Sequence, residues 1–186
     1  GSTVQATYHI SYANSRTHKL SEVAEVRLSQ WRELAHFVSD VVHLKVAGID
    51  GHYASQIVFI AEDGSATSRV KRLAIMDQDG HNIRYLSDGS SIVLTPRFSP
   101  EGDEITYTEI NSGRVRVILR HLVTGQQEVL ETAEGTSTFS PRFSPDGRGI
   151  VYSLALNGNT DIYYMDLQTR ARERLTMDAS AETSPS

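Results

Sequence analysis

Two arginines that occupy the same place in two nearly identical stretches are the first candidates for chemistry. Arg97 lies in "PRFSPEGDEITYT" and Arg142 in "PRFSPDGRGIVYS", 45 residues further along the chain. A guanidinium group binds carboxylate and phosphate groups through a planar fork of N–H donors, so such a pair is one form of an anion clamp. Because each arginine falls in the middle of a predicted strand, one per repeat, we expect a structural role instead, in packing or in pairing between neighbouring repeats.

Three side chains that can bind a metal ion share one face of a predicted helix. His36, Asp40 and His43 follow one another at i, i+4 and i+7, and imidazole and carboxylate groups are ordinary zinc ligands. A trio on a solvated face, with no further groups to orient it, makes a weak metal site, and we interpret it as a plain polar face. The stretch "DQDG", Asp77–Gly80, lacks the later acidic ligands of a calcium loop and is explained by a hairpin turn. We expect no metal and no other cofactor.

The motifs of common enzyme classes are absent from the sequence. It has no G-x-S-x-G nucleophile elbow, no glycine-rich phosphate loop, no H-E-x-x-H motif and no cysteine, so we expect no enzyme. A net charge of −5 over 186 residues, with scattered Lys and Arg, argues against a nucleic-acid partner. No apolar run approaches the roughly 20 residues of a membrane-spanning helix, so we expect no direct membrane insertion.

The doubled stretch belongs to a longer internal repeat. Three series of landmarks recur every 44 or 45 residues: Pro96, Pro141 and Pro185; Met76, His121 and Met165; and Leu86, Leu130 and Leu175. Each unit reads as four short strands, with "SPEG" or "SPDG" as a type I turn between the first two. A repeat of about 40–45 residues with four strands is typical of a β-propeller blade, whereas helical repeats need a different apolar spacing.

These patterns predict a mainly β protein in two parts. Residues 4–53 are expected to be the tail of a small α/β domain, and residues 54–186 an incomplete propeller. Within the propeller we expect blades at 54–88, 93–132 and 138–177 and the start of another at 182–186. The first blade lacks the S-P-D/E-G segment and therefore an inner strand. We interpret the chain as an excerpt of a longer protein, without a closed ring of blades.

The part before the blades has a different pattern. Two segments, Val4–Tyr12 and Ser21–Leu28, show the alternating pattern of β-strands. We expect a helix to follow, with Ser29 as its N-cap and an end near Gly48. Trp31 belongs to the apolar stripe of this helix, and we expect it to pack into a core against the two strands.

Several runs of this sequence closely resemble the TolB family, the periplasmic propellers of the Tol-Pal envelope system, particularly its alphaproteobacterial members. These runs are "VKRLAIMDQDGHNIRYLSDGSSIVLTPRFSPEGDEITY" and "SPRFSPDGRGIVYSLALNGNTDIYYMDLQTRARERLT", with "QWRELAHFVSDVVHLKVAGIDGHY" resembling the helix that leads into the first blade. The resemblance implies a six-bladed ring, of which this chain holds about three blades. The S-P-D-G repeat is shared with propellers of prolyl-oligopeptidase-type serine peptidases, so a noncatalytic propeller domain of such a peptidase stays an alternative.

The resemblance implies a noncatalytic adaptor in the periplasm. TolB proteins bind the lipoprotein Pal at the propeller mouth and communicate with TolA through an N-terminal segment that is mostly absent here. The Tol-Pal system supports outer-membrane integrity and cell division. Bacteriocins such as colicins use it for import. The loops before the inner strands are rich in Ser, Thr and Gly, which suits protein docking better than catalysis. The partner-binding positions carried over are Leu94, Thr95, Ser137, Thr138, Phe139, Ser140, Thr183 and Ser184. Because residues 179–186 form an orphan inner strand, we expect them to pair with an exposed edge, as in a strand-exchange dimer, or to stay disordered.

Overall fold

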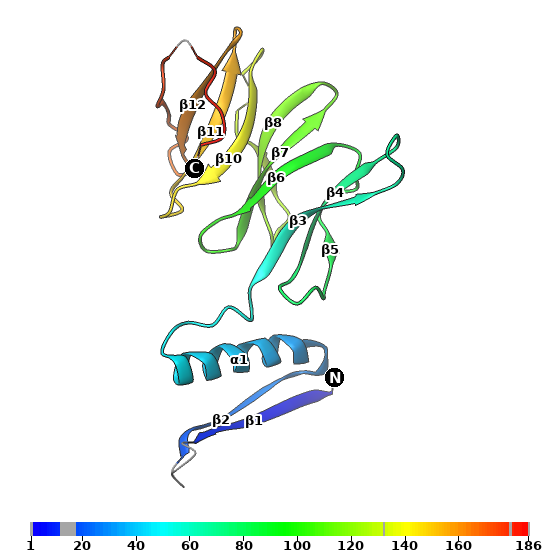
Figure 1. Cartoon of the computed structure of the whole chain (residues 1–186), viewed down its shortest axis with the longest axis vertical. Helices are drawn as coiled ribbons and strands as arrows, with labels where there is room; N and C mark the ends of the chain where they lie inside the picture. The colour runs from blue at the N-terminus through cyan, green and yellow to red at the C-terminus, as the bar shows by residue number, and fades with distance from the viewer. Residues whose placement is uncertain (1, 12–17, 132, 179, 186) are drawn as a thin grey trace. The chain divides into compact units, whose positions relative to one another are not determined.

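The computed structural model describes residues 2–11, 18–131, 133–178 and 180–185 (Figure 1). The chain divides into two compact units, one of Gly1–Ile57 with Met76–Asn82, the other of Val58–Ile75 with Ile83–Ser186. Each unit is described by itself below. No helix in the described part of the chain has both the length and the apolar character that crossing a membrane requires.

The first unit contains a hairpin of two antiparallel strands, β1 (Thr3–Ser11) and β2 (His18–Arg27), followed by the 3₁₀ turn η1 (Leu28–Gln30) and the helix α1 (Trp31–Ala47). Tyr12, the predicted last residue of the first strand, lies outside the described residues. The helix ends as predicted, because Gly48 adopts a φ of 75° and its N–H donates to the carbonyl of Leu44 at 2.9 Å.

Two predictions about the start of this helix are wrong. Ser29 lies inside η1, so the N-cap of α1 is Gln30, which makes no side-chain capping hydrogen bond. Trp31 keeps 52% of its surface exposed, and Leu34 is the buried residue of the helix. A two-stranded ribbon is too narrow to cover a whole helix face, so the first residue of the apolar stripe extends beyond it.

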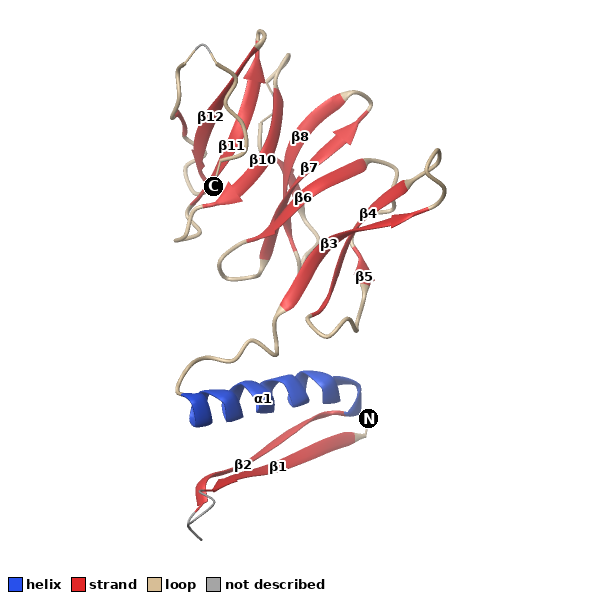
Figure 2. Cartoon of the chain, viewed as in Figure 1, coloured by secondary structure: helices blue, strands red, loops and turns tan. Residues whose placement is uncertain are grey.

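The blades are antiparallel sheets whose strands follow the order of the chain (Figure 2). The first sheet has three strands and each of the next two has four, as the missing S-P-D/E-G segment predicts. The strands are β3 (Gln56–Asp63), β4 (Val70–Asp77) and β5 (Arg84–Tyr85); β6 (Ile92–Phe98), β7 (Glu104–Asn111), β8 (Arg114–His121) and β9 (Gln127–Val129); and β10 (Ser137–Phe143), β11 (Gly149–Leu156), β12 (Asn159–Asp166) and β13 (Arg172–Arg174). The fold is therefore a partial β-propeller.

The repeated S-P-E/D-G segments form the predicted turns. The N–H of Gly102 donates to the carbonyl of Ser99 at 3.0 Å, and that of Gly147 to the carbonyl of Ser144 at 2.9 Å. Both glycines have a positive φ, 77° and 71°, which favours a residue without a side chain. The hydroxyl of Ser144 also accepts from the N–H of Gly149 at 3.0 Å, so the serine closes each turn against the next strand.

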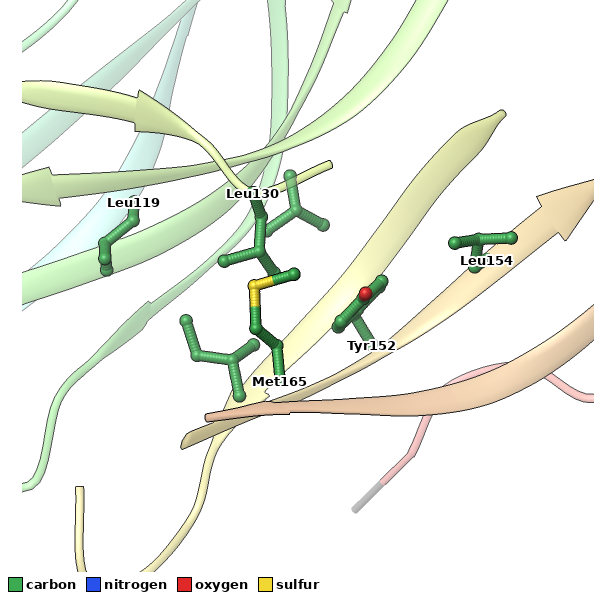
Figure 3. Close-up of a cluster of buried hydrophobic side chains, with 7 residues drawn as sticks. Leu119, Leu130, Tyr152, Leu154 and Met165 are labelled. Carbon is green, nitrogen blue, oxygen red and sulfur yellow. The ribbon is translucent and has the colours of Figure 1, made fainter. Parts of the chain in front are cut away.

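Hydrophobic clusters hold neighbouring blades together. One contains Leu73 of the first blade with Val93, Ile105, Tyr107 and Ile118 of the second. The next joins the second and third blades, and Figure 3 shows its labelled members Leu119, Leu130, Tyr152, Leu154 and Met165 lying between the two sheets. Each blade interface thus has its own apolar core, which is the packing that a propeller requires.

The phenol of Tyr152 makes this core sensitive to alkaline pH. Burial raises the pKa of Tyr152 from its ordinary value of 10.0 to about 12. The unfolded chain therefore loses the phenolic proton first, so the folded state is fully favoured below about pH 10 and loses stability as the pH rises towards 12. We expect Tyr152→Phe to unfold with less dependence on pH in that window than the parent protein does. Urea unfolding at about pH 9 and about pH 11.5 checks this, and equal losses in both proteins would contradict it.

The last described segment, residues 180–185, contacts the third blade of the same chain. The N–H of Glu182 donates to the carbonyl of Thr160 at 2.8 Å, and that of Ser184 to the hydroxyl of Ser153 at 3.3 Å. Residues 180–185 contain no strand, and Ser186 lies outside the described residues. These contacts order part of the segment within one chain, and the strand-exchange dimer stays a prediction.

Candidate functional site

The inner strands β6 and β10 present six of the eight predicted partner-binding residues along one edge of each four-stranded sheet. The other two, Thr183 and Ser184, lie in the last segment, which contains no strand. Ser137, the first residue of β10, lies opposite Ala155, next to the turn between β11 and β12. We call this end of the blades, with the loops before β6 and β10, the mouth end. The S-P-E/D-G turns lie at the opposite end.

Both inner strands are interrupted at the same place. The register of β6 with β7 shifts between Leu94 and Arg97, and that of β10 with β11 between Phe139 and Arg142. Thr95 and Ser140, at the interruptions, have left-handed φ values of 49° and 54°, and Ser184 in the last segment has 62°. Each of the three immediately precedes a proline. A left-handed conformation costs a residue with a side chain about 1–2 kcal/mol, so all three positions are strained and held by their surroundings. Thr95 and Ser140 lie in β-bulges, whereas Ser184 lies in a segment without a strand.

The bulge reverses the alternation of inward and outward side chains. In β6, Val93 is buried before the bulge, and Phe98 packs against the same core after it. An unbroken strand with Val93 inward would also turn Arg97 inward, because side chains alternate with a period of two. The extra residue makes Arg97 exposed instead, and Arg142 is exposed at the same place in β10.

The predicted structural role of these two arginines is wrong. Within the described ranges neither makes an ion pair, and a guanidinium nitrogen of Arg97 donates to the carbonyl of its neighbour Pro96 at 2.9 Å. Other arginines connect the blades: Arg120 donates to the carbonyl of Leu86 at 2.7 Å, and Arg170 and Arg172 of the third blade pair with glutamates of the second, Glu128 and Glu131. An arginine connects two blades only if its side chain is close enough to a partner on the neighbouring blade. The sequence does not show which arginines meet this condition.

The eight predicted partner-binding residues do not all reach the surface. Seven of them are exposed or partly exposed: Leu94, Thr95, Ser137, Phe139, Ser140, Thr183 and Ser184. We call these seven residues the inner-strand row. Thr138 is only 1% exposed, so we leave it out of the surface.

Thr138 supplies a hydroxyl acceptor that the second blade lacks. In the first and third blades, the N–H groups of Leu73 and Ile162 donate to the hydroxyls of Ser87 and Thr176, each at 2.9 Å. The second blade has Glu131 at the corresponding place. There the hydroxyl of Thr138, from the next blade's inner strand, accepts from the N–H of Val117 at 2.8 Å. This residue therefore stabilises the interface between the blades.

Hydroxyl groups also fix the bulges. The N–H of Ser140 donates to the Thr108 hydroxyl at 3.2 Å, as that of Ser184 does to the Ser153 hydroxyl one blade later. Thr108 and Ser153 are equivalent repeat positions, 45 residues apart. The bulge of β10 and the left-handed Ser184 in the last segment are thus each attached to the preceding blade.

Two hollows border the inner-strand row. A narrow cleft of about 80 Å³ lies between the bulges, lined by Thr95, Arg97, Ser140, Pro141, Arg142, Ser184 and Pro185. A wider pocket of about 390 Å³ lies at the mouth end, where the β7–β8 turn meets the loop before β10; its lining consists of Gly113, Arg114, Arg116, Val129, Glu131, Ala133, Glu134, Gly135, Thr136 and Ser137. No sequence motif marks this pocket, because its two sides are brought together only by folding.

Charged groups at the mouth end are held in place by local contacts. The N–H of Ser90 donates to a carboxylate oxygen of Asp88 at 2.8 Å, and with the hydroxyl of Ser90 it lowers the pKa of Asp88 below the usual range. Beside the wider pocket, Arg116 pairs with Glu109 at 2.9 Å. The mouth end therefore offers fixed charges of both signs together with hydroxyl groups.

The polar helix face in the first unit is not solvated as predicted. Asp40 accepts from the N–H groups of Tyr53 and Ala54 at 2.8 and 3.1 Å, and His36 lies 3.1 Å from a carboxylate oxygen of Asp79. The ring of His43 packs near that of Tyr53, with centroids 5.8 Å apart. His36 thus contacts Asp79, whereas Asp40 and His43 contact Tyr53, and the described residues hold no cluster of three or more metal-ligating side chains. Asp79, in the "DQDG" stretch, also pairs with Arg32.

Comparison with known proteins identifies the propeller. The family model of the TolB beta propeller domain matches residues 43–186. The crystal structure of TolB from Acinetobacter baumannii is 27% identical, with a TM-score of 0.78 over 97% of this chain and 48% of that one. A putative TolB from Agrobacterium tumefaciens is 18% identical over 65% of this chain and 45% of its own, with a TM-score of 0.55. A puromycin hydrolase is 17% identical over 70% of this chain and 22% of its own, with a TM-score of 0.57. The chain spans about half the length of the two TolB structures.

Proposed function

The chain belongs to the family of TolB β-propeller domains, and from that premise we propose that it is part of a noncatalytic periplasmic adaptor of the Tol-Pal system. In this proposal the mouth end binds the lipoprotein Pal, and the protein communicates with TolA through its N-terminal region. Its role would be to support outer-membrane integrity and cell division, and it would serve as a site used in bacteriocin import.

One observation carries this proposal. The likeness to the Acinetobacter TolB extends over 97% of the chain, so it includes most of the hairpin and helix before the blades as well as the blades themselves. The likeness to the puromycin hydrolase covers 70%, a share close to that of residues 54–186. At 17% identity that likeness shows the fold alone and does not bring a peptidase function to this chain.

The inner-strand row supports docking of a protein surface. It combines two half-buried apolar side chains, Leu94 and Phe139, with exposed or partly exposed hydroxyl groups, and the Thr108 hydroxyl holds the bulges of both β6 and β10. Aromatic anchors surrounded by polar groups are typical of the central part of a protein interface. A rigid row of this kind binds without much loss of conformational entropy.

The test is a binding measurement between the full-length protein and the soluble domain of Pal. We expect saturable binding by isothermal titration calorimetry, and we expect Phe139→Ala to weaken it at least about tenfold, since removal of a central aromatic anchor commonly costs that much. Phe139 belongs to the row and pairs with Ser153 across the sheet.

Val123→Ala is the matched control. Val123 is 87% exposed in the turn after β8, at the end of the blade opposite the mouth, and its truncation should leave Pal binding unchanged. Thermal melts of both variants check that they are folded. Absence of binding at high micromolar Pal would exclude the proposed adaptor role, and equal weakening by both variants would exclude the inner-strand row as its surface.

A further inference from the structure

The narrow cleft between the bulges has an unusual composition. Two guanidinium groups, those of Arg97 and Arg142, line its approximately 80 Å³ together with the hydroxyl residues Thr95, Ser140 and Ser184. No acidic side chain is among the residues that line it. The cleft therefore concentrates two positive charges and hydroxyl donors in a small volume.

The two positive charges are not neutralised by the protein. In the described ranges of the chain, several arginines elsewhere on the blades pair with acids, as Arg116 does with Glu109 at 2.9 Å and Arg174 with Asp161 at 2.7 Å. Arg97 and Arg142 make no such pair there, although the chain carries 23 acidic residues and a net charge of −5. A guanidinium group that lines a cleft and lacks an anion can accept one from outside.

The position of both arginines depends on strained backbone. Thr95 and Ser140 hold left-handed φ values of 49° and 54°, and these bulges turn the arginines outward. Restraint comes from the hydroxyl of Thr108, which lies 3.2 Å from the Thr95 hydroxyl and accepts from the Ser140 N–H at the same distance. One side chain thus connects the two bulges, so the two arginines are presented by a common support. Strain maintained at equivalent positions of neighbouring blades is typical of a functional site.

We propose that this cleft binds an oxyanion, a phosphate or carboxylate group, between Arg97 and Arg142. Its volume suits one small group, and a guanidinium fork matches the paired oxygens of both kinds of anion. Ser140 and Ser184 supply hydroxyl donors beside the arginines. The site goes beyond the proposed adaptor function, because it rests on the arginines of β6 and β10 and not on Pal.

The test uses nuclear magnetic resonance of the full-length, ¹⁵N-labelled protein titrated with inorganic phosphate and, separately, with acetate, each at constant ionic strength maintained with chloride. We expect saturable shifts of the amide signals of Thr95, Ser140 and Ser184 with at least one of the two anions. Binding of phosphate alone assigns the site to phosphate groups, binding of acetate alone assigns it to carboxylates, and binding of both assigns it to either kind of oxyanion. The double variant Arg97→Gln/Arg142→Gln should weaken this binding at least about tenfold.

Arg148→Gln is the control for charge alone. Arg148 keeps 82% of its side chain exposed in the turn after β10, and it does not line the cleft. Its loss should change the anion affinity less than about twofold, because salt screens the effect of an exposed charge that lies away from the cleft. The proposal is overturned if neither anion gives saturable shifts, if the double variant binds as the parent does, or if Arg148→Gln weakens binding as much as the double variant. The amide spectrum of each variant shows in the same experiment that it is folded.

Discussion

Replacement of Tyr152 by alanine is expected to lower the free energy of unfolding by about 3–5 kcal/mol. Tyr152 is fully buried in the cluster between the second and third blades, which also contains Val117. Figure 3 shows Tyr152 with Leu130 and Met165 of the same cluster. Its ring is the largest fully buried side chain of the described part of the chain. Truncation would remove its apolar surface and leave a cavity that two stiff sheets cannot close. Urea unfolding of the full-length protein, followed by circular dichroism, measures the loss.

Tyr152→Phe is the matched variant for this experiment. The Tyr152 hydroxyl is buried and has no hydrogen-bond partner among the described residues, so its removal takes away a desolvated polar group and leaves the ring in place. We expect this variant to be as stable as the parent near neutral pH, or more stable by up to about 1 kcal/mol. A large loss in Tyr152→Phe, or a loss below about 1 kcal/mol in Tyr152→Ala, would contradict the role assigned to the ring.

Substitution of Thr138 by valine is expected to lower the free energy of unfolding by about 1–3 kcal/mol. Valine has nearly the same shape but no hydroxyl, so the buried N–H of Val117 would lose the acceptor that now lies 2.8 Å away. The cost of leaving a buried donor unpaired is larger than the net gain from an ordinary hydrogen bond. Thermal and urea unfolding of the variant measure this cost.

Thr138→Ser separates the hydroxyl from the methyl group. Serine keeps the acceptor for Val117, and we expect most of the lost stability to return, with a remaining deficit of about 1 kcal/mol for the missing buried methyl group. Because Thr138 is buried, neither variant is expected to alter Pal affinity once folded. If valine proves neutral, the hydroxyl does not have the role that the structure gives it; if serine is as unstable as valine, packing of the methyl group explains the loss.

Most of the fold could be read from the sequence because its signals are local. The S-P-E/D-G segments specify turns through their own serine and glycine, and Gly48 ends α1 through its own backbone conformation. The first blade lacks such a segment, and the structure gives it three strands. Errors occurred where a neighbour decides the outcome: Trp31 stays exposed because the hairpin is narrow, and His36 and Asp40 contact parts of the chain that are distant in sequence.

The candidate site was predicted less well, for a related reason. Leu94, Thr138 and Phe139 were all carried over from the family resemblance as partner-binding positions. The structure places all three on inner strands, but the burial of Thr138 could not be foreseen. The second blade has Glu131 where the other blades have a serine or threonine whose hydroxyl accepts from a strand N–H. The Thr138 hydroxyl of the next blade is buried because it accepts from the N–H of Val117 instead. A sequence repeat shows which positions are equivalent. It does not show which residue of another blade takes over the role of a side chain that one blade lacks.

By itself, the sequence determined the propeller repeat, the turns and the position of each inner strand, because hydrophobic period and turn chemistry act within a few residues of the chain. Only the tertiary structure decided which way Arg97 and Arg142 point. Strict alternation from Val93 would turn Arg97 inward, and the bulge at Thr95, whose hydroxyl lies beside that of Thr108 on the next strand β7, reverses that direction. One left-handed residue per strand, held in both strands by the Thr108 hydroxyl, thereby converts an expected packing residue into an exposed charge.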